Sequence, residues 1–156
     1  MLVRGLMVGI VVLDQLTKHV VWFNFDLGQA RQVIPRLFDI RYVRNTGAAW
    51  GMFAGHRWPL IAVSVVMLVL LRMHRRELYA LGLRGRVALG LLLGGIIGNL
   101  IDRVRFGYVV DFLDFHIGQS HFPAFNVADA AICCGVFVYM VSIFLAGRSK
   151  VDAGDR

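Results

Sequence analysis

Residues 90–130, GLLLGGIIGNLIDRVRFGYVVDFLDFHIGQSHFPAFNVADA, connect the end of one apolar segment to the start of another. In the first part of this stretch, glycine recurs at every fourth position, at Gly90, Gly94 and Gly98. A stripe of small residues on a helix lets a neighbouring helix backbone approach closely, so this part is predicted to be a tightly packed membrane helix. The stretch then carries Asp111 and Asp129 at the borders of apolar segments.

These two aspartates predict a shared carboxyl site. A charged residue near the centre of a bilayer costs about 2.5–3.5 kcal/mol, so it persists mainly where it faces a cavity or a partner. If the helix that ends near Asp111 and the helix that begins near Asp129 are neighbours, both carboxyl groups can reach one point at the membrane face. Two carboxylates at one point cannot both ionise easily, so they share a proton and serve as an acid and a base. This chemistry is typical of aspartic peptidases.

Composition indicates a polytopic membrane protein with a single domain over residues 1–156. Of its 156 residues, 58% are hydrophobic, and the mean hydropathy is +0.65, whereas a soluble domain has roughly 45–50% apolar residues. The net charge of +7 comes largely from arginines in the connections between apolar segments, which argues against a nucleic-acid-binding module. Cys133 and Cys134 are adjacent, so they supply no disulfide framework and too few ligands for a zinc site.

Four apolar segments are predicted to span the membrane, at residues 2–22, 58–73, 87–105 and 127–146. The first has about 21 residues, enough to cross ~30 Å of hydrocarbon at ~1.5 Å per residue. The second is short, and we expect the arginines at its ends to extend toward the headgroups. Asp14 and Lys18 lie one helical turn apart in the first segment and can form an ion pair. This pair either helps the helix to pack or holds the mouth of the active site.

The connections between these segments predict the orientation of the chain. Residues 72–86 contain five arginines and one glutamate, and such a dense basic loop is expected on the cytoplasmic side, with both termini. Residues 23–57 are mostly polar. Alternating residues around Tyr42, followed by the turn Asn45-Thr46-Gly47, predict a short strand in a small sheet that forms a cradle on the outer membrane face. The apolar residues 48–53 that follow are too few to span a membrane.

Several residues near the two aspartates have a structural interpretation as well as a functional one. Asn126 can cap the last apolar helix, which puts Asp129 at the third helical position, where backbone N–H groups favour a carboxylate. For this reason Asp129 is expected to be the ionised member of the pair. Asn99 and Arg103, one turn apart, either form a network with Asp102 or leave Arg103 to hold a substrate carbonyl or a lipid phosphate. Similarly, Asn45 either forms the turn or contacts substrate.

A zinc site at His116, His121 and the nearby aspartates is the alternative chemistry for the connection at residues 106–125. However, the spacing of these residues matches no metalloprotease motif, and the chain contains no His-Glu-x-x-His sequence. We therefore interpret the two histidines as surface residues near the headgroups and predict no metal.

Five motifs in this order resemble the lipoprotein signal peptidases, also called signal peptidase II or prolipoprotein signal peptidases. The motifs are DQLTK (14–18), NTGAAWG (45–51), GGIIGNLIDR (94–103), VVDF (109–112) and FNVAD (125–129). Together they cover nearly the whole chain.

The resemblance implies an all-α membrane protein with four transmembrane helices, a small periplasmic β-cradle and a short half-helix. It implies an aspartic endopeptidase of the bacterial inner membrane, with both termini cytoplasmic and the active site toward the periplasm. This enzyme would remove signal peptides from prolipoproteins, amino-terminal to a diacylglyceryl-modified cysteine. Asp111 and Asp129 carry over as the catalytic dyad. The resemblance also implies that eight further residues support the active site or bind substrate: Asp14, Lys18, Asn45, Gly47, Asn99, Arg103, Asn126 and Ala128.

The expected partners are the diacylglyceryl-modified prolipoprotein, membrane lipids and an inhibitor of the globomycin type. No nucleic acid, metal or cofactor is expected, and the protein is expected to be a monomer. Two other classes remain open. An ion-coupled transporter would use the intramembrane charges as a proton path, although the acids gather toward one face and no internal repeat is evident. A scaffold that binds lipid or a partner helix would use the glycine stripe but leaves the acidic motifs unexplained.

Overall fold

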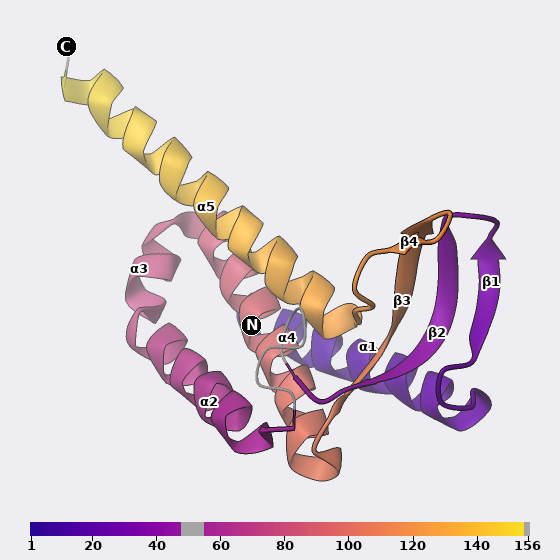
Figure 1. The fold of residues 1–156 in the computed structure, drawn as a ribbon. Helices are drawn as coiled ribbons and strands as arrows, with labels where there is room; N and C mark the ends of the chain where they lie inside the picture. The colour runs from indigo at the N-terminus through magenta and orange to yellow at the C-terminus, as the bar shows by residue number, and fades with distance from the viewer. Residues whose placement is uncertain (48–54, 155–156) are drawn as a thin grey trace.

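The computed structural model describes residues 1–47 and 55–154. Several long helices pack together, and a small sheet stands to one side of them (Figure 1). The elements in chain order are α1 (Leu2–Asn24), β1 (Ala30–Ile34), β2 (Phe38–Asn45), α2 (Arg57–Met73), α3 (Arg75–Ala80), α4 (Gly82–Phe106), β3 (Val109–Ile117), β4 (Ser120–His121) and α5 (Val127–Gly154).

Three of the described helices are long and apolar enough to cross a membrane, at Leu2–Asn24, Gly82–Phe106 and Val127–Arg148. The remaining long helix, α2, has 17 residues. At ~1.5 Å per residue it is about 25 Å long, which is less than the ~30 Å of a bilayer's hydrocarbon core. Three of the four predicted spans therefore meet the requirement for length and composition, and the span at α2 stays a prediction.

The helices begin and end close to the predicted limits, with two exceptions. α4 begins at Gly82 rather than at residue 87, and α5 runs to Gly154 rather than to residue 146. Polar residues can extend an existing helix because each added residue gains a backbone hydrogen bond without a new nucleation cost. The predicted half-helix at residues 48–53 lies outside the described residues.

The sheet corrects the expected all-α class. Its four antiparallel strands lie in the order β1-β2-β3-β4, so half of the strands come from residues 109–121, which sequence analysis treated as a connection. The cradle predicted within residues 23–57 is therefore only one part of the sheet.

The position of Asp111 also differs from the expectation. It lies on strand β3, opposite Val43 of β2, and not at the end of a membrane helix. Gly107 ends α4 in the left-handed conformation, with φ of 80°, which a glycine adopts without strain. The residues that follow, Val109 and Val110, favour a strand because β-branched side chains pack well on a pleated surface.

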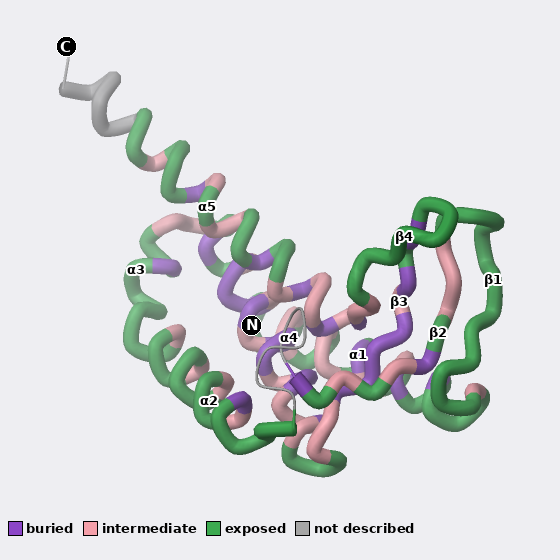
Figure 2. The backbone as a smooth tube through the Cα atoms, in the orientation of Figure 1, coloured by how far each residue is buried: buried purple, intermediate pink, exposed green. Residues whose placement is uncertain are grey.

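The glycine stripe explains how α4 becomes the central helix, the most buried of the three apolar helices (Figure 2). A β-carbon added at Gly90 would lie 3.0 Å from the side chain of Leu6, and one at Gly94 would lie 2.7 Å from Cβ of Ile10. Leu6 and Ile10 are both on α1. The prediction that the stripe admits a closely packed helix is therefore confirmed.

We expect Gly94→Ala to destabilise the protein because the added methyl group must displace Ile10 and a backbone oxygen of Met7, 3.0 Å away. Overpacking of this kind costs typically 1–3 kcal/mol. The measurement is the thermal unfolding midpoint in detergent. Gly9→Ala is the matched control, because a β-carbon at Gly9 meets nothing within 4 Å. Equal midpoints for the two variants would contradict the packing account.

Candidate active site

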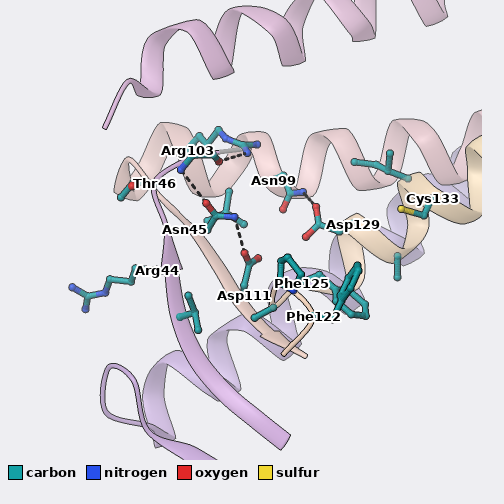
Figure 3. A pocket seen from close by; sticks show the side chains of 17 residues that line it. Arg44, Asn45, Thr46, Asn99, Arg103, Asp111, Phe122, Phe125, Asp129 and Cys133 are labelled. Carbon is teal, nitrogen blue, oxygen red and sulfur yellow. Dashed lines mark hydrogen bonds between the residues drawn. The ribbon is translucent and has the colours of Figure 1, made fainter. Parts of the chain in front are cut away.

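A cavity of about 740 Å³ opens where the sheet meets the helices. Its walls come from the end of β2, the start of β3, the outer part of α4, the first turns of α5 and the segment at residues 122–125 (Figure 3). Both aspartates singled out from the sequence line this cavity, Asp111 from β3 and Asp129 from α5. Residues distant in sequence thus meet at one site.

Asp111 is almost fully buried and is held by two amide side chains. Asn45 donates from Nδ2 to its Oδ2 at 2.9 Å, and Asn126 donates from Nδ2 to its Oδ1 at 2.7 Å. Burial, and next the neighbouring Asp129 carboxylate, raise the pKa of Asp111 to about 7. Asp111 can therefore keep a proton near neutral pH and serve as an acid.

Asp129 has the helix-capping contacts and also faces the cavity. The backbone N–H of Asn126 donates to its Oδ2 at 3.2 Å, and its own N–H donates to Oδ1 of Asn126 at 3.0 Å. This reciprocal pair is the capping-box arrangement expected from the sequence. Its other oxygen, Oδ1, accepts from Nδ2 of Asn99 at 2.7 Å. The structural and the functional interpretations of Asp129 are thus compatible.

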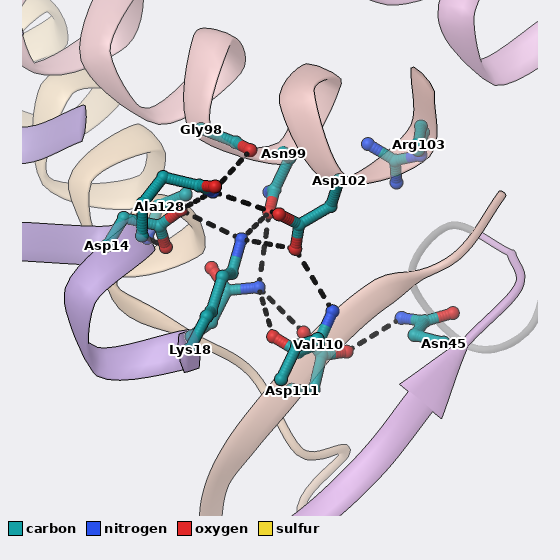
Figure 4. A network of polar contacts seen from close by, with 12 residues as sticks. Asp14, Lys18, Asn45, Gly98, Asn99, Asp102, Arg103, Val110, Asp111 and Ala128 are labelled. Carbon is teal, nitrogen blue, oxygen red and sulfur yellow. Dashed lines mark hydrogen bonds and ion pairs between the residues drawn. The ribbon is translucent and has the colours of Figure 1, made fainter. Parts of the chain in front are cut away.

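A buried cluster of charges lies behind these amides (Figure 4). Lys18 Nζ lies 2.9 Å from Asp14 Oδ2 and 3.0 Å from Asp102 Oδ2, and the predicted ion pair with Asp14 is confirmed. Their side chains are at most 3% exposed. Removing one partner from such a buried group typically costs 3–5 kcal/mol because the other charge is left unpaired.

The charge cluster also orients Asn99. Lys18 donates to Oδ1 of Asn99 at 2.9 Å, and Asn126 donates to the same oxygen at 3.1 Å. Since both donors approach Oδ1, the amide nitrogen of Asn99 must point the other way, toward Asp129. The site is also held through Ala128, whose backbone N–H donates to Asp14 Oδ1 at 2.9 Å.

Arg103 lines the cavity from α4. Its Nη2 donates to the carbonyl of Gly47 at 3.3 Å, while its buried Nε has no partner among the described residues. The guanidinium group of Arg103 is therefore placed beside the cavity. No hydrogen bond or ion pair joins Asp102 to Arg103 among the described residues, because the Asp102 carboxylate pairs with Lys18.

Sequence analysis did not include Asp102 among the site residues. Its Oδ2 accepts from the backbone N–H of Val110 at 3.1 Å, and its Oδ1 accepts from Nε2 of Gln15 at 2.9 Å. Asp102 thereby anchors the start of β3 next to Asp111. The available signal was its position three residues after Asn99, which puts both polar side chains near one face of an apolar helix.

The two histidines belong to the sheet, where His121 is exposed as expected but His116 is buried, which corrects its interpretation as a surface residue. Their rings stack at 4.7 Å; His116 Nε2 lies 3.4 Å from Asp39 Oδ2, and His121 Nδ1 lies 2.8 Å from Asp114 Oδ1. Neither histidine lines the cavity. Within residues 1–47 and 55–148, no group of three or more His, Cys, Asp or Glu side chains is placed to hold a metal ion.

Comparison of the fold defines the class of protein. A solved structure described as a bacterial membrane enzyme, determined by the in meso method at 2.3 Å, superposes with a TM-score of 0.87 at 34% identity, covering 95% of this chain and 90% of the other. A second one, at 1.9 Å, has a TM-score of 0.80 at 35% identity, covering 90% and 91% of the two chains. The fold is thus that of a bacterial membrane enzyme.

Sequence comparison identifies the family. The model of the family described as signal peptidase (SPase) II matches residues 6–145. The lipoprotein signal peptidase of Syntrophotalea carbinolica is 48% identical over 136 residues, covering 85% of this chain and 84% of the relative. That of Shewanella pealeana is 45% identical over 139 residues, covering 86% and 81%. The chain belongs to the signal peptidase II family and is a membrane protease, which argues against the transporter and the scaffold.

The pKa of Asp111 gives a testable pH dependence. Between its ordinary value of 3.8 and about 7, folded Asp111 holds a proton that the unfolded chain has lost, so its contribution to stability falls as pH rises through this window. The infrared C=O band of a protonated carboxyl should disappear with a midpoint of about 7 and be absent in Asp111→Asn. In Asp129→Asn the midpoint should move to lower pH, because a neighbouring negative charge is removed.

A protonated-carboxyl band that survives in Asp111→Asn and vanishes in Asp129→Asn would assign the proton to Asp129 and contradict this account.

Proposed function

We propose that this protein is an aspartic endopeptidase that removes signal peptides from bacterial prolipoproteins, amino-terminal to a diacylglyceryl-modified cysteine. One observation carries the proposal: Asp111 and Asp129 line the same cavity, and the charge of one raises the pKa of the other. Two coupled carboxyl groups with different environments can divide the roles of acid and base. Membership of the signal peptidase II family supports the choice of substrate.

In the proposed mechanism, ionised Asp129 takes a proton from a water molecule, and the resulting hydroxide attacks the scissile carbonyl carbon. Protonated Asp111 donates to the carbonyl oxygen as the tetrahedral intermediate forms. Protonated Asp129 then donates its proton to the amine nitrogen as the C–N bond breaks, and Asp111 regains a proton from a hydroxyl group of the intermediate. The helix N-terminus favours negative charge at Asp129, and burial favours the neutral form of Asp111. The reaction involves no covalent enzyme intermediate.

The surrounding residues position these two groups. Asn45 and Asn126 hold the oxygens of Asp111, and Asn99 holds Asp129. Arg103 lines the cavity and binds a substrate carbonyl through its guanidinium group, which Gly47 holds by accepting from Nη2. A supporting role is proposed for Lys18, which donates to Asn99, for Asp14, which pairs with Lys18, and for Ala128, which donates to Asp14.

The proposed setting is the bacterial inner membrane. With four spans, including α2, both termini and the basic α3 region lie in the cytoplasm, and the cavity faces the periplasm. This orientation agrees with the rule that short cytoplasmic loops are rich in lysine and arginine. Substrate then arrives with its signal helix and its acyl chains in the same bilayer as the enzyme. The protein acts as a monomer without metal or cofactor, and a globomycin-type inhibitor binds over the two aspartates.

The decisive experiment is cleavage of a diacylglyceryl-modified prolipoprotein by the purified protein in detergent. Asp111→Asn and Asp129→Asn should each lower the rate by roughly 10²–10⁴-fold or more, because general acid–base catalysis contributes on this order. Asp26→Asn is the matched control, since Asp26 is exposed and does not line the cavity. A chelator should leave the wild-type rate unchanged. Cleavage that persists in both site variants would exclude the aspartates from the chemistry.

Topology can be tested by labelling introduced cysteines in intact cells with a membrane-impermeant maleimide. Cysteine at Arg36, in the turn between β1 and β2, should react from outside. Cysteine at Arg76, in α3, should react only after the membrane is permeabilised. Labelling of the parent chain measures the background reaction of Cys133 and Cys134. The opposite labelling pattern would reverse the proposed orientation.

A further inference from the structure

A second group of cations lies at the end of α4, outside the chemistry proposed for the cavity. The guanidinium carbon of Arg105 lies 5.0 Å from the ring centre of Phe106, and Phe106 stacks on Tyr108 at 5.7 Å. The guanidinium carbon of Arg44, on β2, lies 4.9 Å from the ring centre of Tyr108. Two arginines thus flank a stack of two aromatic rings.

Arg57, at the start of α2, joins this group. A β-carbon at Gly107 would lie 3.5 Å from Cδ and 3.6 Å from Nη1 of Arg57, so this side chain crosses the turn between Phe106 and Tyr108. Its guanidinium carbon lies 4.8 Å from the ring centre of Trp58. We call Arg44, Arg57 and Arg105 the arginine patch. It surrounds one turn of the chain from three separate elements.

The arginine patch has positive charge without internal compensation. All three side chains are exposed, and none forms an ion pair with a carboxylate in the part of the chain that the structure describes. Arg44 donates from Nε to the hydroxyl of Tyr42 at 2.9 Å, which leaves its terminal nitrogens without a protein acceptor among the described residues. An aromatic ring packs against the planar face of a guanidinium group, so the N–H groups at its edge stay available to a phosphate oxygen.

The patch also lies beside the ends of three helices. α1 ends at Asn24, α4 ends at Phe106 and α2 begins at Arg57, and Trp22 packs on Phe106 at 6.3 Å. Tryptophan and tyrosine gather at such helix ends because their rings suit the membrane–water interface. Lipid phosphodiesters occupy the same depth, and clustered arginines attract those of anionic lipids.

We propose that the arginine patch binds the phosphodiester headgroup of an anionic glycerophospholipid from the bilayer. The headgroup bridges β2, the end of α4 and the start of α2. Arg44 directly precedes Asn45, which donates to Asp111 at 2.9 Å. A bound headgroup therefore holds the end of β2 in place beside the cavity, and anionic lipid should raise the cleavage rate. This last consequence rests on the proposed function, whereas lipid binding itself does not.

The test compares the full-length chain with Arg57→Gln/Arg105→Gln. Native mass spectrometry in neutral detergent measures how much phosphatidylglycerol each protein retains compared with phosphatidylcholine. The cleavage rate is measured separately, in nanodiscs made of each lipid. The double variant should bind phosphatidylglycerol on the order of 10- to 30-fold more weakly, because each interfacial arginine contributes several-fold to anionic-lipid binding. Arg31→Gln/Arg36→Gln removes equal charge from exposed positions of the sheet and should leave binding unchanged.

Equal loss of phosphatidylglycerol in the control pair would overturn the proposal, because general surface charge would then explain the binding. Displacement of bound phosphatidylglycerol by inorganic phosphate alone would also overturn the proposal, since a free anion would then be the ligand. Selective loss of lipid binding supports the patch even if no cleavage is observed, so failure of the proposed function remains distinguishable. Unchanged thermal unfolding of both double variants confirms that each is folded.

Discussion

The buried ion cluster of Lys18 with Asp14 and Asp102 is the interaction on which the rest of the structure depends. Three charges inside an apolar helix bundle are tolerable only when each is paired and hydrogen-bonded. The required partners come from three elements around the site: Asn99 on α4, the backbone of Ala128 on α5 and the backbone of Val110 on β3. Satisfying these charges therefore positions the elements that carry the two cavity aspartates.

Close approach of the helices makes this cluster possible. A β-carbon at Gly98 would lie 2.6 Å from Oδ2 of Asp14, so glycine is needed where the charge cluster meets α4. The amide side chains of Asn99 and Asn126 then connect this cluster to the two cavity aspartates. Asn99 accepts from Lys18 of the cluster and donates to Asp129, and Asn126 donates to both Asn99 and Asp111. Stability and the orientation of the carboxyl groups thus depend on the same hydrogen bonds.

Much of the site could be predicted from the sequence because its motifs are local. The Asp14–Lys18 pair follows from a spacing of one helical turn, and the cap of Asn126 on Asp129 follows from a spacing of three residues. The apolar lengths of α1, α4 and α5 likewise indicate membrane helices. The expectation for Asp111 was wrong, because a short apolar run fits a helix end and a buried strand equally well.

The sequence by itself determined the family, indicated a membrane protein and predicted most of the residues that the structure brings together around the cavity, since these depend on composition and short spacings. Only the tertiary structure decided that β3 completes the cradle, that Asp102 anchors it, and that Arg44, Arg57 and Arg105 gather around one turn. These arrangements join residues far apart in the chain. Strand pairing and helix packing over such separations are set by the complete fold, and no local pattern specifies them.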